Sequence, residues 1–285
     1  MSDSPGRRQP GPAAGDRPGW RRWLDAMLAL PNDSPRKTLF VALALCLVCS
    51  VVVSSAAVLL RPLQLENAAL DRKRNIVEVA GLLGAGGNVE SAFQHVDARV
   101  VDLGTGEFRQ DIDPAVYDQR KAAKDPKQSV ALSPDADIAG IGRRARHATV
   151  YFIREGDAIQ QVILPVHGYG LWSTLYGFLA LEGDFRTVSG LRFYEHAETP
   201  GLGGEVDNPS WRAKWDGKVA FDESGRPVIE VIKGVVDETR SGAEHRVDGL
   251  AGATLTTRGV DKLLKFWLGE NGFGPFLARM RKETR

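Results

Sequence analysis

The segment of this 285-residue chain best suited to chemistry is a run of small residues that ends in hydroxyls. It reads Asp248-Gly249-Leu250-Ala251-Gly252-Ala253-Thr254-Leu255-Thr256-Thr257. Residues 258–268 follow with apolar side chains at helical spacing, so we expect a helix with Thr256 or Thr257 as its N-cap. A helix N-terminus has unpaired N–H groups and partial positive charge, which favour a phosphate. Thr254 places a hydroxyl among glycines and alanines that leave the backbone open. On the residues alone, an ordinary glycine-rich turn before a capped helix is the more common structure.

Two further loops combine glycine with aromatic, hydroxyl or acidic side chains. The first is Gly170-Leu171-Trp172-Ser173, and the second is Glu198-Thr199-Pro200-Gly201-Leu202-Gly203. Glycine lets a backbone approach a ligand closely, and tryptophan offers a large surface for stacking. These residue types suit loops that lie close to a ligand.

The three segments resemble, in the same order, the motifs of the FMN-binding domain family. Together with residues 32–34, the apolar stretch after them and residues 70–76, they also resemble the NqrC family of the sodium-translocating NADH:quinone reductases. The resemblance implies that Thr254 carries FMN through a phosphoester bond. A separate flavin transferase with magnesium would make this bond when the Thr254 hydroxyl attacks the phosphoanhydride of FAD and AMP leaves. Ala251 stands where the best-known form of the motif has serine, at a position that varies in the family.

The resemblance also implies roles for the other site residues. Trp172 would pack against the isoalloxazine ring, and Glu198 would orient neighbouring donors or meet a ribityl hydroxyl. Lys233 would approach the flavin or its phosphate. A core tryptophan, a surface carboxylate and a solvated lysine are the alternatives for these three residues. The residues expected to bind the cofactor are Thr254, Trp172, Ser173, Glu198, Thr199, Leu202, Gly203, Lys233, Ala253 and Leu255. No catalytic residue and no metal site are expected.

The function implied by the resemblance is electron transfer within a membrane NADH:ubiquinone oxidoreductase that pumps sodium. Electrons would pass from NADH in another protein of the complex through an iron–sulfur centre to this FMN, and then to the flavins of a membrane component and to ubiquinone. The alternatives are the flavin-carrying component of the related ferredoxin:NAD oxidoreductase complex and a non-redox, membrane-anchored sensor or assembly factor. The expected partners are the other subunits, the flavin transferase during maturation, and membrane lipid. Nucleic acid is not expected, because the net charge is only +1 and no strongly basic patch is evident.

A membrane anchor is expected ahead of these motifs, because residues 39–60 are apolar and carry no charge. A helix of about 20 apolar residues spans a bilayer and pairs its own backbone groups. A cleavable signal peptide is the alternative, but this apolar run is longer than the usual core and lies far from Met1. More basic residues precede the span than follow it, which predicts a cytoplasmic N-terminus and a periplasmic C-terminal domain at a bacterial inner membrane.

The chain is therefore expected to have three parts: a cytoplasmic tail over 1–38, a transmembrane helix over 39–60 and a periplasmic FMN-binding domain over 61–285. Residues 1–19 are rich in proline, glycine and charge and are expected to be disordered. Residues 20–30 combine tryptophan, arginine and leucine. They either lie on the membrane surface as an amphipathic helix or form a frayed or partner-contacting tail.

The remaining motifs mostly exclude functions. Both cysteines, Cys46 and Cys49, lie in the span, so the exported domain has no disulfide and no cysteine-bound metal or iron–sulfur cluster. In an apolar helix the two thiols are expected to pack, although contact with a metal centre held by partner subunits stays open. The sequence has no zinc-protease motif, Walker loop, dinucleotide-binding glycine pattern or nucleophile elbow, so a hydrolase or an NAD-binding enzyme has no support.

The exported domain is expected to have an α+β fold, with an antiparallel sheet and flanking helices. We predict a helix over 66–83, a helix or helix–strand pair over 89–103 and a polar excursion over 104–147. Apolar or alternating stretches with turns between them predict strands over 149–153, 160–166, 178–181, 187–193 and 228–236.

Overall fold

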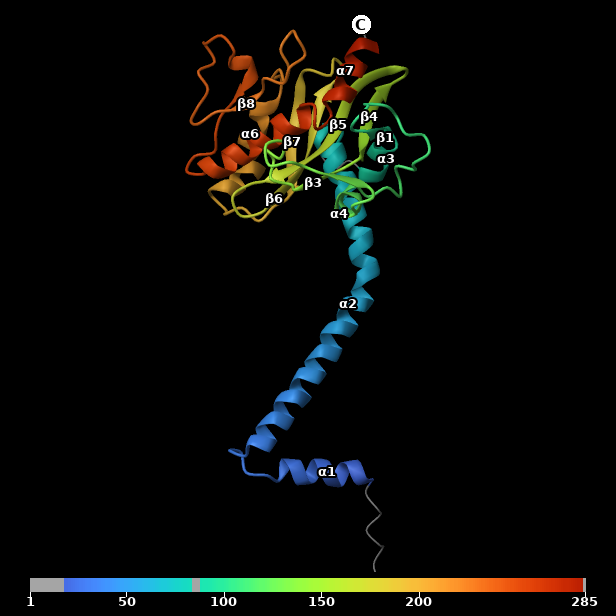
Figure 1. The fold of residues 1–285 in the computed structure, drawn as a ribbon, viewed down its shortest axis with the longest axis vertical. Helices are drawn as coiled ribbons and strands as arrows, with labels where there is room; N and C mark the ends of the chain where they lie inside the picture. The colour runs from blue at the N-terminus through green and yellow to red at the C-terminus, as the bar shows by residue number, and fades with distance from the viewer. Residues whose placement is uncertain (1–17, 84–87, 284–285) are drawn as a thin grey trace, which may run out of the picture. The chain divides into compact units, whose positions relative to one another are not determined.

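The computed structural model describes residues 18–83 and 88–283 of the chain (Figure 1). The chain divides into two compact units, the first ending at Asn67 and the second beginning at Ala68. Helix α1 (Gly19–Leu28) and most of helix α2 (Pro35–Val79) form the first unit. The second unit begins with the last turns of α2 and contains every strand in the described ranges.

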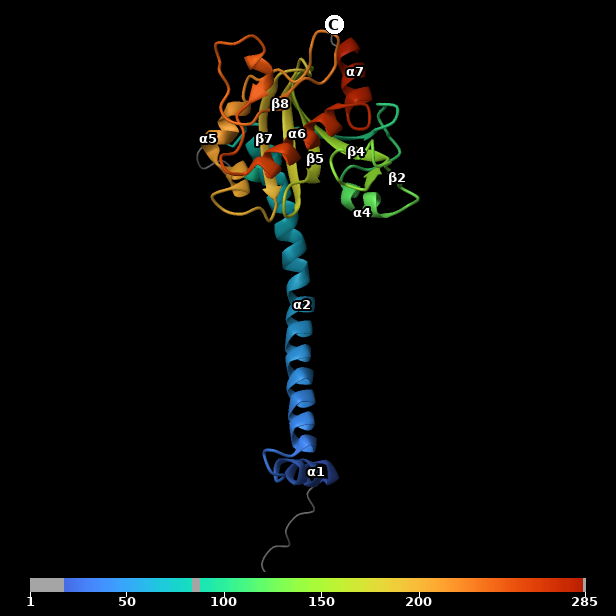
Figure 2. The ribbon, with the colours of Figure 1, turned by 60° about the vertical axis from the view of Figure 1, so that its left-hand side comes forward.

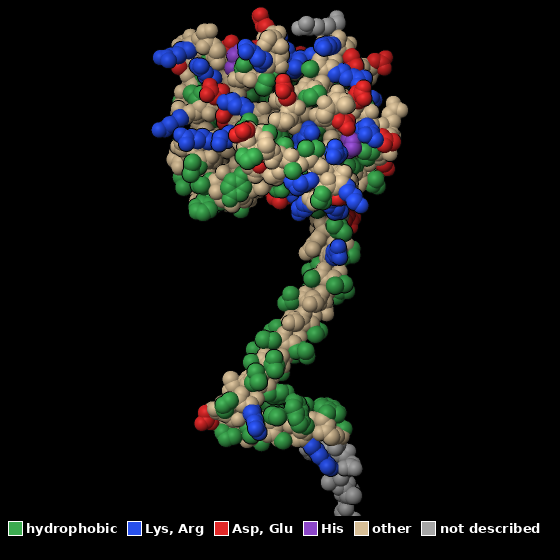
Figure 3. All heavy atoms as spheres, in the orientation of Figure 1, with side chains coloured by type: hydrophobic (Ala, Val, Ile, Leu, Met, Phe, Trp, Pro, Cys, Tyr) green, Lys and Arg blue, Asp and Glu red, His purple; other side chains and the backbone are tan. Residues whose placement is uncertain are grey.

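Helix α2 is 45 residues long and includes the predicted span at 39–60. It is the one helix in the described ranges that is long and apolar enough to cross a membrane. Apolar side chains cover this stretch in Figure 3. The prediction of a separate helix over 66–83 is wrong in its bounds, because α2 continues without a break beyond residue 60 and ends at Val79. Gly81 ends it with φ of 69°, as Leu82 N–H donates to Val77 O and Gly81 N–H donates to Glu78 O.

Five antiparallel strands form the sheet of the second unit, in the order β1-β4-β5-β6-β7. Helix α3 (Val89–Phe93) precedes β1 (Val96–Asp102), as the predicted helix–strand pair requires. The other strands are β4 (His147–Glu155), β5 (Ala158–Tyr169), β6 (Thr174–Glu182) and β7 (Val188–Glu195). The strands predicted over 149–153 and 160–166 pair as β4 and β5, and those predicted over 178–181 and 187–193 pair as β6 and β7. These four strands and the predicted α+β class are therefore confirmed.

Helices cover both faces of this sheet. On one face, α6 (Thr254–Leu268) and α7 (Gly274–Glu283) enclose a core that includes Phe152, Leu164 and Trp267 (Figure 2). On the other face, the end of α2 packs Ile76 against Ile163 and other side chains of the sheet. Leu164 and Ile163 are neighbours on β5 that point to opposite faces, so the apolar run of this strand follows from burial on both sides.

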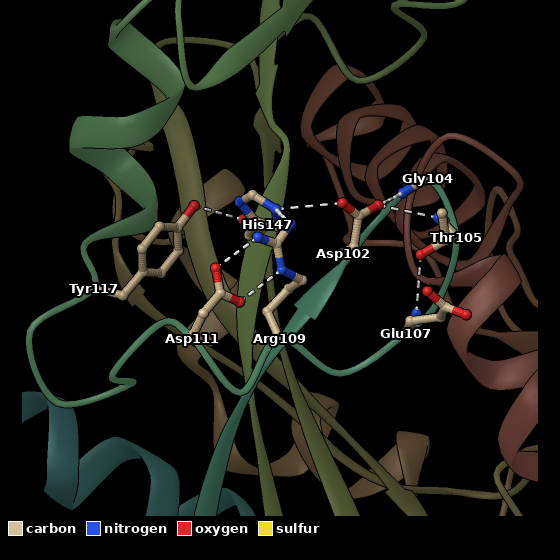
Figure 4. Close-up of polar contacts among 8 residues, drawn as sticks. All are labelled: Asp102, Gly104, Thr105, Glu107, Arg109, Asp111, Tyr117 and His147. Atoms are coloured by element: carbon tan, nitrogen blue, oxygen red, sulfur yellow. Dashed lines mark hydrogen bonds and ion pairs between the residues drawn. The ribbon is translucent and has the colours of Figure 1, made fainter.

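The polar excursion over 104–147 carries α4 (Gln119–Lys124) and the short pair β2 (Ser129–Ala131) and β3 (Arg143–Ala145). A polar cluster holds its two ends together (Figure 4). His147 Nε2 lies 3.3 Å from Asp102 Oδ2 and 3.1 Å from Arg109 Nη1, and the Tyr117 hydroxyl donates to His147 O at 2.9 Å. Burial, followed by the nearby Arg109 charge, lowers the pKa of His147 although Asp102 opposes this effect.

The strand predicted over 228–236 is wrong in its extent. Within residues 228–236, only Glu230–Val231 (β8) forms a strand. It pairs in parallel with β9 (Arg246–Val247). Gly234, with φ of 95°, turns the backbone out of the extended conformation. Short helical turns fill the connections, namely α5 (Pro209–Arg212) and the 3₁₀ segments Gly203–Asp207, Ala213–Trp215 and Ala243–His245.

Candidate functional site

Thr254 is the first residue of α6, and the residue before it, Ala253, is the N-cap. The predicted caps, Thr256 and Thr257, are wrong, because both are buried in the first turn with their hydroxyls turned inward. Thr257 Oγ1 accepts a hydrogen bond from the Leu250 N–H at 3.0 Å. Within the described ranges, no side chain caps this helix end. Its first N–H groups therefore lack a capping side-chain acceptor and lie beside a half-buried Thr254.

Close backbone contacts fix the position of this helix end. A Cβ atom at Gly259 would lie 2.6 Å from Tyr169 O and 2.9 Å from Gly170 Cα, so α6 packs directly on the loop after β5. A Cβ at Gly249 would lie 2.3 Å from Ile232 O. Both positions therefore require glycine, and the resulting contacts place the start of α6 against two neighbouring loops.

Glu198 ties the second motif loop to the other two motifs. Its side chain is only 5 % exposed. One carboxylate oxygen, Oε1, accepts from the N–H groups of Leu171 at 3.0 Å, Trp172 at 2.9 Å and Ser173 at 3.3 Å. The other, Oε2, accepts from the Thr256 hydroxyl at 2.7 Å. Glu198 is therefore a buried anchor between the 170–173 loop and α6, and the surface-carboxylate alternative is wrong.

These donors keep Glu198 ionised. Burial alone would raise the pKa of the carboxyl, but the Trp172 N–H, the Thr256 hydroxyl and the two other N–H groups together lower it below its ordinary value. The glycines nearby leave room for this carboxylate. A Cβ at Gly170 would lie 2.6 Å from Glu198 Oε1, and one at Gly203 would lie 2.7 Å from Oε2. The buried carboxylate therefore explains Gly170 and Gly203, whereas Gly201 allows a turn with φ of 76°.

Large apolar side chains stand exposed on all three tied segments. Trp172 is 66 % exposed, Leu202 is 44 % exposed and Leu255 is 53 % exposed. The core alternative for Trp172 is therefore wrong. A Cβ at Gly252 would lie 3.0 Å from Leu202 Cδ2, so Leu202 reaches the residues just before Thr254. An apolar, planar ligand is the kind of molecule that would cover such side chains favourably.

Of the remaining predicted residues, Ser173 and Thr199 form hydrogen bonds that brace the loops, and Lys233 is exposed to solvent. The Ser173 hydroxyl accepts from the Ala197 N–H at 2.7 Å, and Thr199 O accepts from the Leu202 N–H at 3.1 Å, so both residues brace the loops. Lys233 is exposed, and the next residue, Gly234, accepts from the Gly249 N–H at 2.9 Å. Lys233 therefore lies beside the segment that leads to Thr254.

The sequence reasoning missed the role of Asp248 at the start of the run. Its side chain accepts from the Val236 N–H at 2.7 Å and pairs with Lys214, and its backbone oxygen accepts from Trp211 Nε1 at 2.8 Å. Asp248 is 7 % exposed. The position of a carboxylate at the head of the glycine run was a signal that it anchors that run.

A narrow slot of about 50 Å³ lies apart from these motifs, between α4 and the sheet. His167 and Tyr176 line it as stacked rings 5.4 Å apart, and the Arg120 guanidinium lies 3.4 Å from the centre of the Tyr176 ring. Burial, and secondarily Arg120, lowers the pKa of His167 to about 4. None of the predicted site residues lines this slot. We therefore place the candidate site at the start of α6.

The residues at the start of α6 fit a phosphorylated flavin. The uncapped helix N-terminus suits a phosphate, since its first N–H groups have no capping side chain. The exposed Trp172 offers an aromatic surface on the adjoining loop. The described residues contain no group of three or more acidic, histidine or cysteine side chains placed to hold a metal ion.

Comparison with known proteins identifies a family domain that contains all three motif segments. Residues 170–269 match the model of the FMN-binding domain family. The chain is 54% identical over 255 residues to the NqrC protein of the Na(+)-translocating NADH-quinone reductase of Pseudomonas aeruginosa, covering 88% of this chain and 98% of that protein. It is likewise 54% identical to the protein of the same name from Vibrio anguillarum, covering 89% and 98%.

Two solved structures are similar to the chain as well. The crystal structure of Shewanella oneidensis NqrC matches with a TM-score of 0.68 and 36% identity, covering 74% of this chain and 96% of that one. The crystal structure of the corresponding protein of the Na(+)-translocating NADH-quinone reductase from Parabacteroides distasonis matches with a TM-score of 0.59 and 26% identity, covering 76% and 96%.

Proposed function

The chain belongs to the NqrC family of the Na(+)-translocating NADH-quinone reductases, and from this premise we propose that it carries an FMN on Thr254 and relays electrons within such a reductase. The observation that supports the attachment most directly is the position of Thr254. It is the first residue of an uncapped, 15-residue helix, beside loops that a buried Glu198 ties together.

The proposed attachment needs a hydroxyl at a helix N-terminus. The Thr254 oxygen forms a bond to the flavin-side phosphorus of FAD, the phosphoanhydride bond breaks, and AMP leaves with the bonding electrons while the hydroxyl proton passes to a base. A flavin transferase with magnesium would catalyse this step, and nothing is oxidised or reduced in it. The unpaired N–H groups of the first turn then stabilise the negative charge of the phosphodiester.

The other residues of the site would position the ring. Trp172, Leu202 and Leu255 present apolar surface to it, and Lys233 supplies a positive charge beside the segment leading to Thr254. Glu198 holds the loop of Trp172 against α6, while Ser173 and Thr199 brace their loops. When bound, FMN supplies the redox chemistry, and the protein supplies position and electrostatics.

The proposed setting is a bacterial inner membrane. Residues 39–60 of α2 would span it, with residues 1–38 in the cytoplasm and the domain of 61–285 in the periplasm. The partners would be the other subunits of the reductase, membrane lipid and, during maturation, the flavin transferase. Ubiquinone would be the final acceptor of the complex, with sodium export coupled to electron flow. The names of the relatives favour this reductase over a ferredoxin:NAD oxidoreductase.

Complementation tests the proposal. A bacterium that lacks its own NqrC would express the wild-type chain, Thr254→Val or Thr254→Ser, each together with an active flavin transferase, and its membranes would be assayed. We expect sodium-stimulated NADH:quinone reductase activity with the wild type and its loss with Thr254→Val, which keeps the side-chain shape and removes the hydroxyl. The serine variant keeps a hydroxyl and controls for packing. Full activity of Thr254→Val, with the protein present in the membrane, would refute the proposed role of Thr254.

A further inference from the structure

Helix α1 has a continuous apolar face whose side chains are all exposed or half-buried in the described part of the chain. Trp20, Trp23, Leu24 and Met27 follow the i, i+3, i+4, i+7 spacing that places side chains on one side of a helix. None of the residues of α1 is buried, and Trp20, Trp23 and Leu28 are 59 %, 51 % and 56 % exposed. Exposed tryptophans at this density need a covering surface, since large apolar patches in water are unfavourable.

The opposite face of α1 is polar and basic. By their spacing, Arg21, Arg22 and Asp25 lie on the side away from Trp20 and Trp23. The Arg21 guanidinium lies 5.3 Å from the centre of the Trp20 ring, at the boundary between the two faces. Two further cations, Arg36 and Lys37, follow at the start of α2. The first unit thus combines an aromatic, apolar stripe with basic groups at its edge.

The turn between α1 and α2 is braced, so α1 is held beside the start of the apolar span. Lys37 Nζ donates to Leu30 O and to Asn32 Oδ1, both at 2.8 Å. The rings of Trp23 and Phe40 meet edge to face with their centres 5.1 Å apart. Within this first unit, Figures 1 and 2 both show α1 lying across the adjoining end of α2. An amphipathic helix that crosses the end of a spanning helix lies along the plane of the bilayer surface.

We propose that α1 is an interfacial helix that binds the anionic headgroup layer of the bilayer, with Trp20 and Trp23 in the boundary to the acyl chains and Arg21 and Arg22 on lipid phosphates. This inference rests on the proposed membrane span of α2. Charge complementarity and nearness to the span select lipid as the partner. Figure 3 agrees with this assignment, as apolar side chains gather on α1 and on the adjoining part of α2.

Tryptophan fluorescence of the full chain in vesicles tests the inference. The vesicles contain phosphatidylcholine and phosphatidylglycerol, with bromine atoms on part of the acyl chains, and the wild type is compared with the Trp20→Phe/Trp23→Phe variant. The difference between the two reports Trp20 and Trp23. We expect brominated lipid to quench this difference signal and aqueous iodide to leave it largely unquenched. Quenching by iodide and not by brominated lipid would overturn the inference.

Charge variants and extraction complete the test. The Arg21→Glu/Arg22→Glu variant should lose the quenching by brominated lipid, since anionic lipid repels it, while Arg21→Lys/Arg22→Lys should keep it. Unchanged quenching in the glutamate variant would overturn the headgroup assignment. Washing at alkaline pH separates failure of this inference from failure of the span. Release of the wild-type chain from the vesicles would refute both, whereas retention without lipid quenching would refute only the interfacial helix.

Discussion

Replacing Glu198 with glutamine should destabilise the second unit and lower its flavin content. The native carboxylate accepts three backbone N–H groups and the Thr256 hydroxyl while only 5 % exposed. Glutamine keeps one acceptor oxygen and nearly the same shape. It loses the negative charge, and it places an NH₂ group where Oε2 accepted from Thr256. The change therefore weakens the link between the 170–173 loop and α6 without creating a cavity.

The four contacts set the size of the effect. A hydrogen bond to a charged group contributes about 1 kcal/mol more than a neutral one, and the bonds to one carboxylate are not fully additive. We therefore expect Glu198→Gln to lower the free energy of unfolding by about 2–4 kcal/mol. For a domain of this size, that corresponds to a fall in the melting temperature of roughly 5–15 °C.

Thermal unfolding of the full chain in detergent, followed by circular dichroism, measures this change. Glu78→Gln is the matched control, because Glu78 Oε2 pairs with Arg192 Nη2 at 2.6 Å on the other face of the sheet. Both variants should melt earlier, but only Glu198→Gln should reduce the FMN content and alter the flavin spectrum. A melting temperature and flavin content equal to the wild type for Glu198→Gln would refute the anchoring role.

Three other predictions test separate parts of the structure. Burial lowers the pKa of His167 from 6.5 to about 4, so its contribution to stability is complete above pH 6.5 and is lost as the pH falls, by about 2 kcal/mol at pH 5. In denaturant titrations, His167→Phe should therefore lose less stability than the wild type between pH 7 and pH 5. An equal loss in the two proteins would contradict the assignment. Gly259→Ala should lower the unfolding free energy by about 1–3 kcal/mol, since its Cβ would lie 2.6 Å from Tyr169 O, and an unchanged denaturation midpoint would show that α6 can shift. Trp172→Ala should change stability by no more than about 0.5 kcal/mol because the side chain is exposed, yet it should alter the flavin absorption and fluorescence, and an unaltered spectrum would exclude Trp172 from the ring contact.

Much of the fold follows from local patterns in the sequence. Alternating and apolar runs around the turns at 154–157 and 182–184 locate the hairpins, because strand pairing there involves neighbouring residues. Local patterns failed where tertiary contacts decide the structure. Threonine is a common N-cap residue, but the hydroxyls of Thr256 and Thr257 form hydrogen bonds with Glu198 and with the Leu250 N–H. They do not cap the helix, which begins at Thr254. The 228–236 stretch has strand composition, but the turn at Gly234 interrupts it.

The candidate site was only partly predictable for a related reason. Composition marked the run at 248–257, and the resemblance added the 170–173 and 198–203 loops and assigned all three to one ligand. The contacts of Glu198 were not predictable, because its partners lie 25–58 residues away along the chain and chain spacing does not give such distances. The role of Asp248 was missed for the same reason, since its partners Lys214 and Val236 lie 34 and 12 residues away along the chain.

The intact mass of the denatured protein tests the central claim most directly. The wild type and Thr254→Val would be produced with an active flavin transferase and measured after removal of all non-covalent ligands. We expect the wild type to be heavier than its sequence by one FMN phosphoester, located on the peptide containing Thr254, and the variant to have its unmodified mass. An unmodified wild type, while the transferase modifies a control acceptor, would contradict the claim.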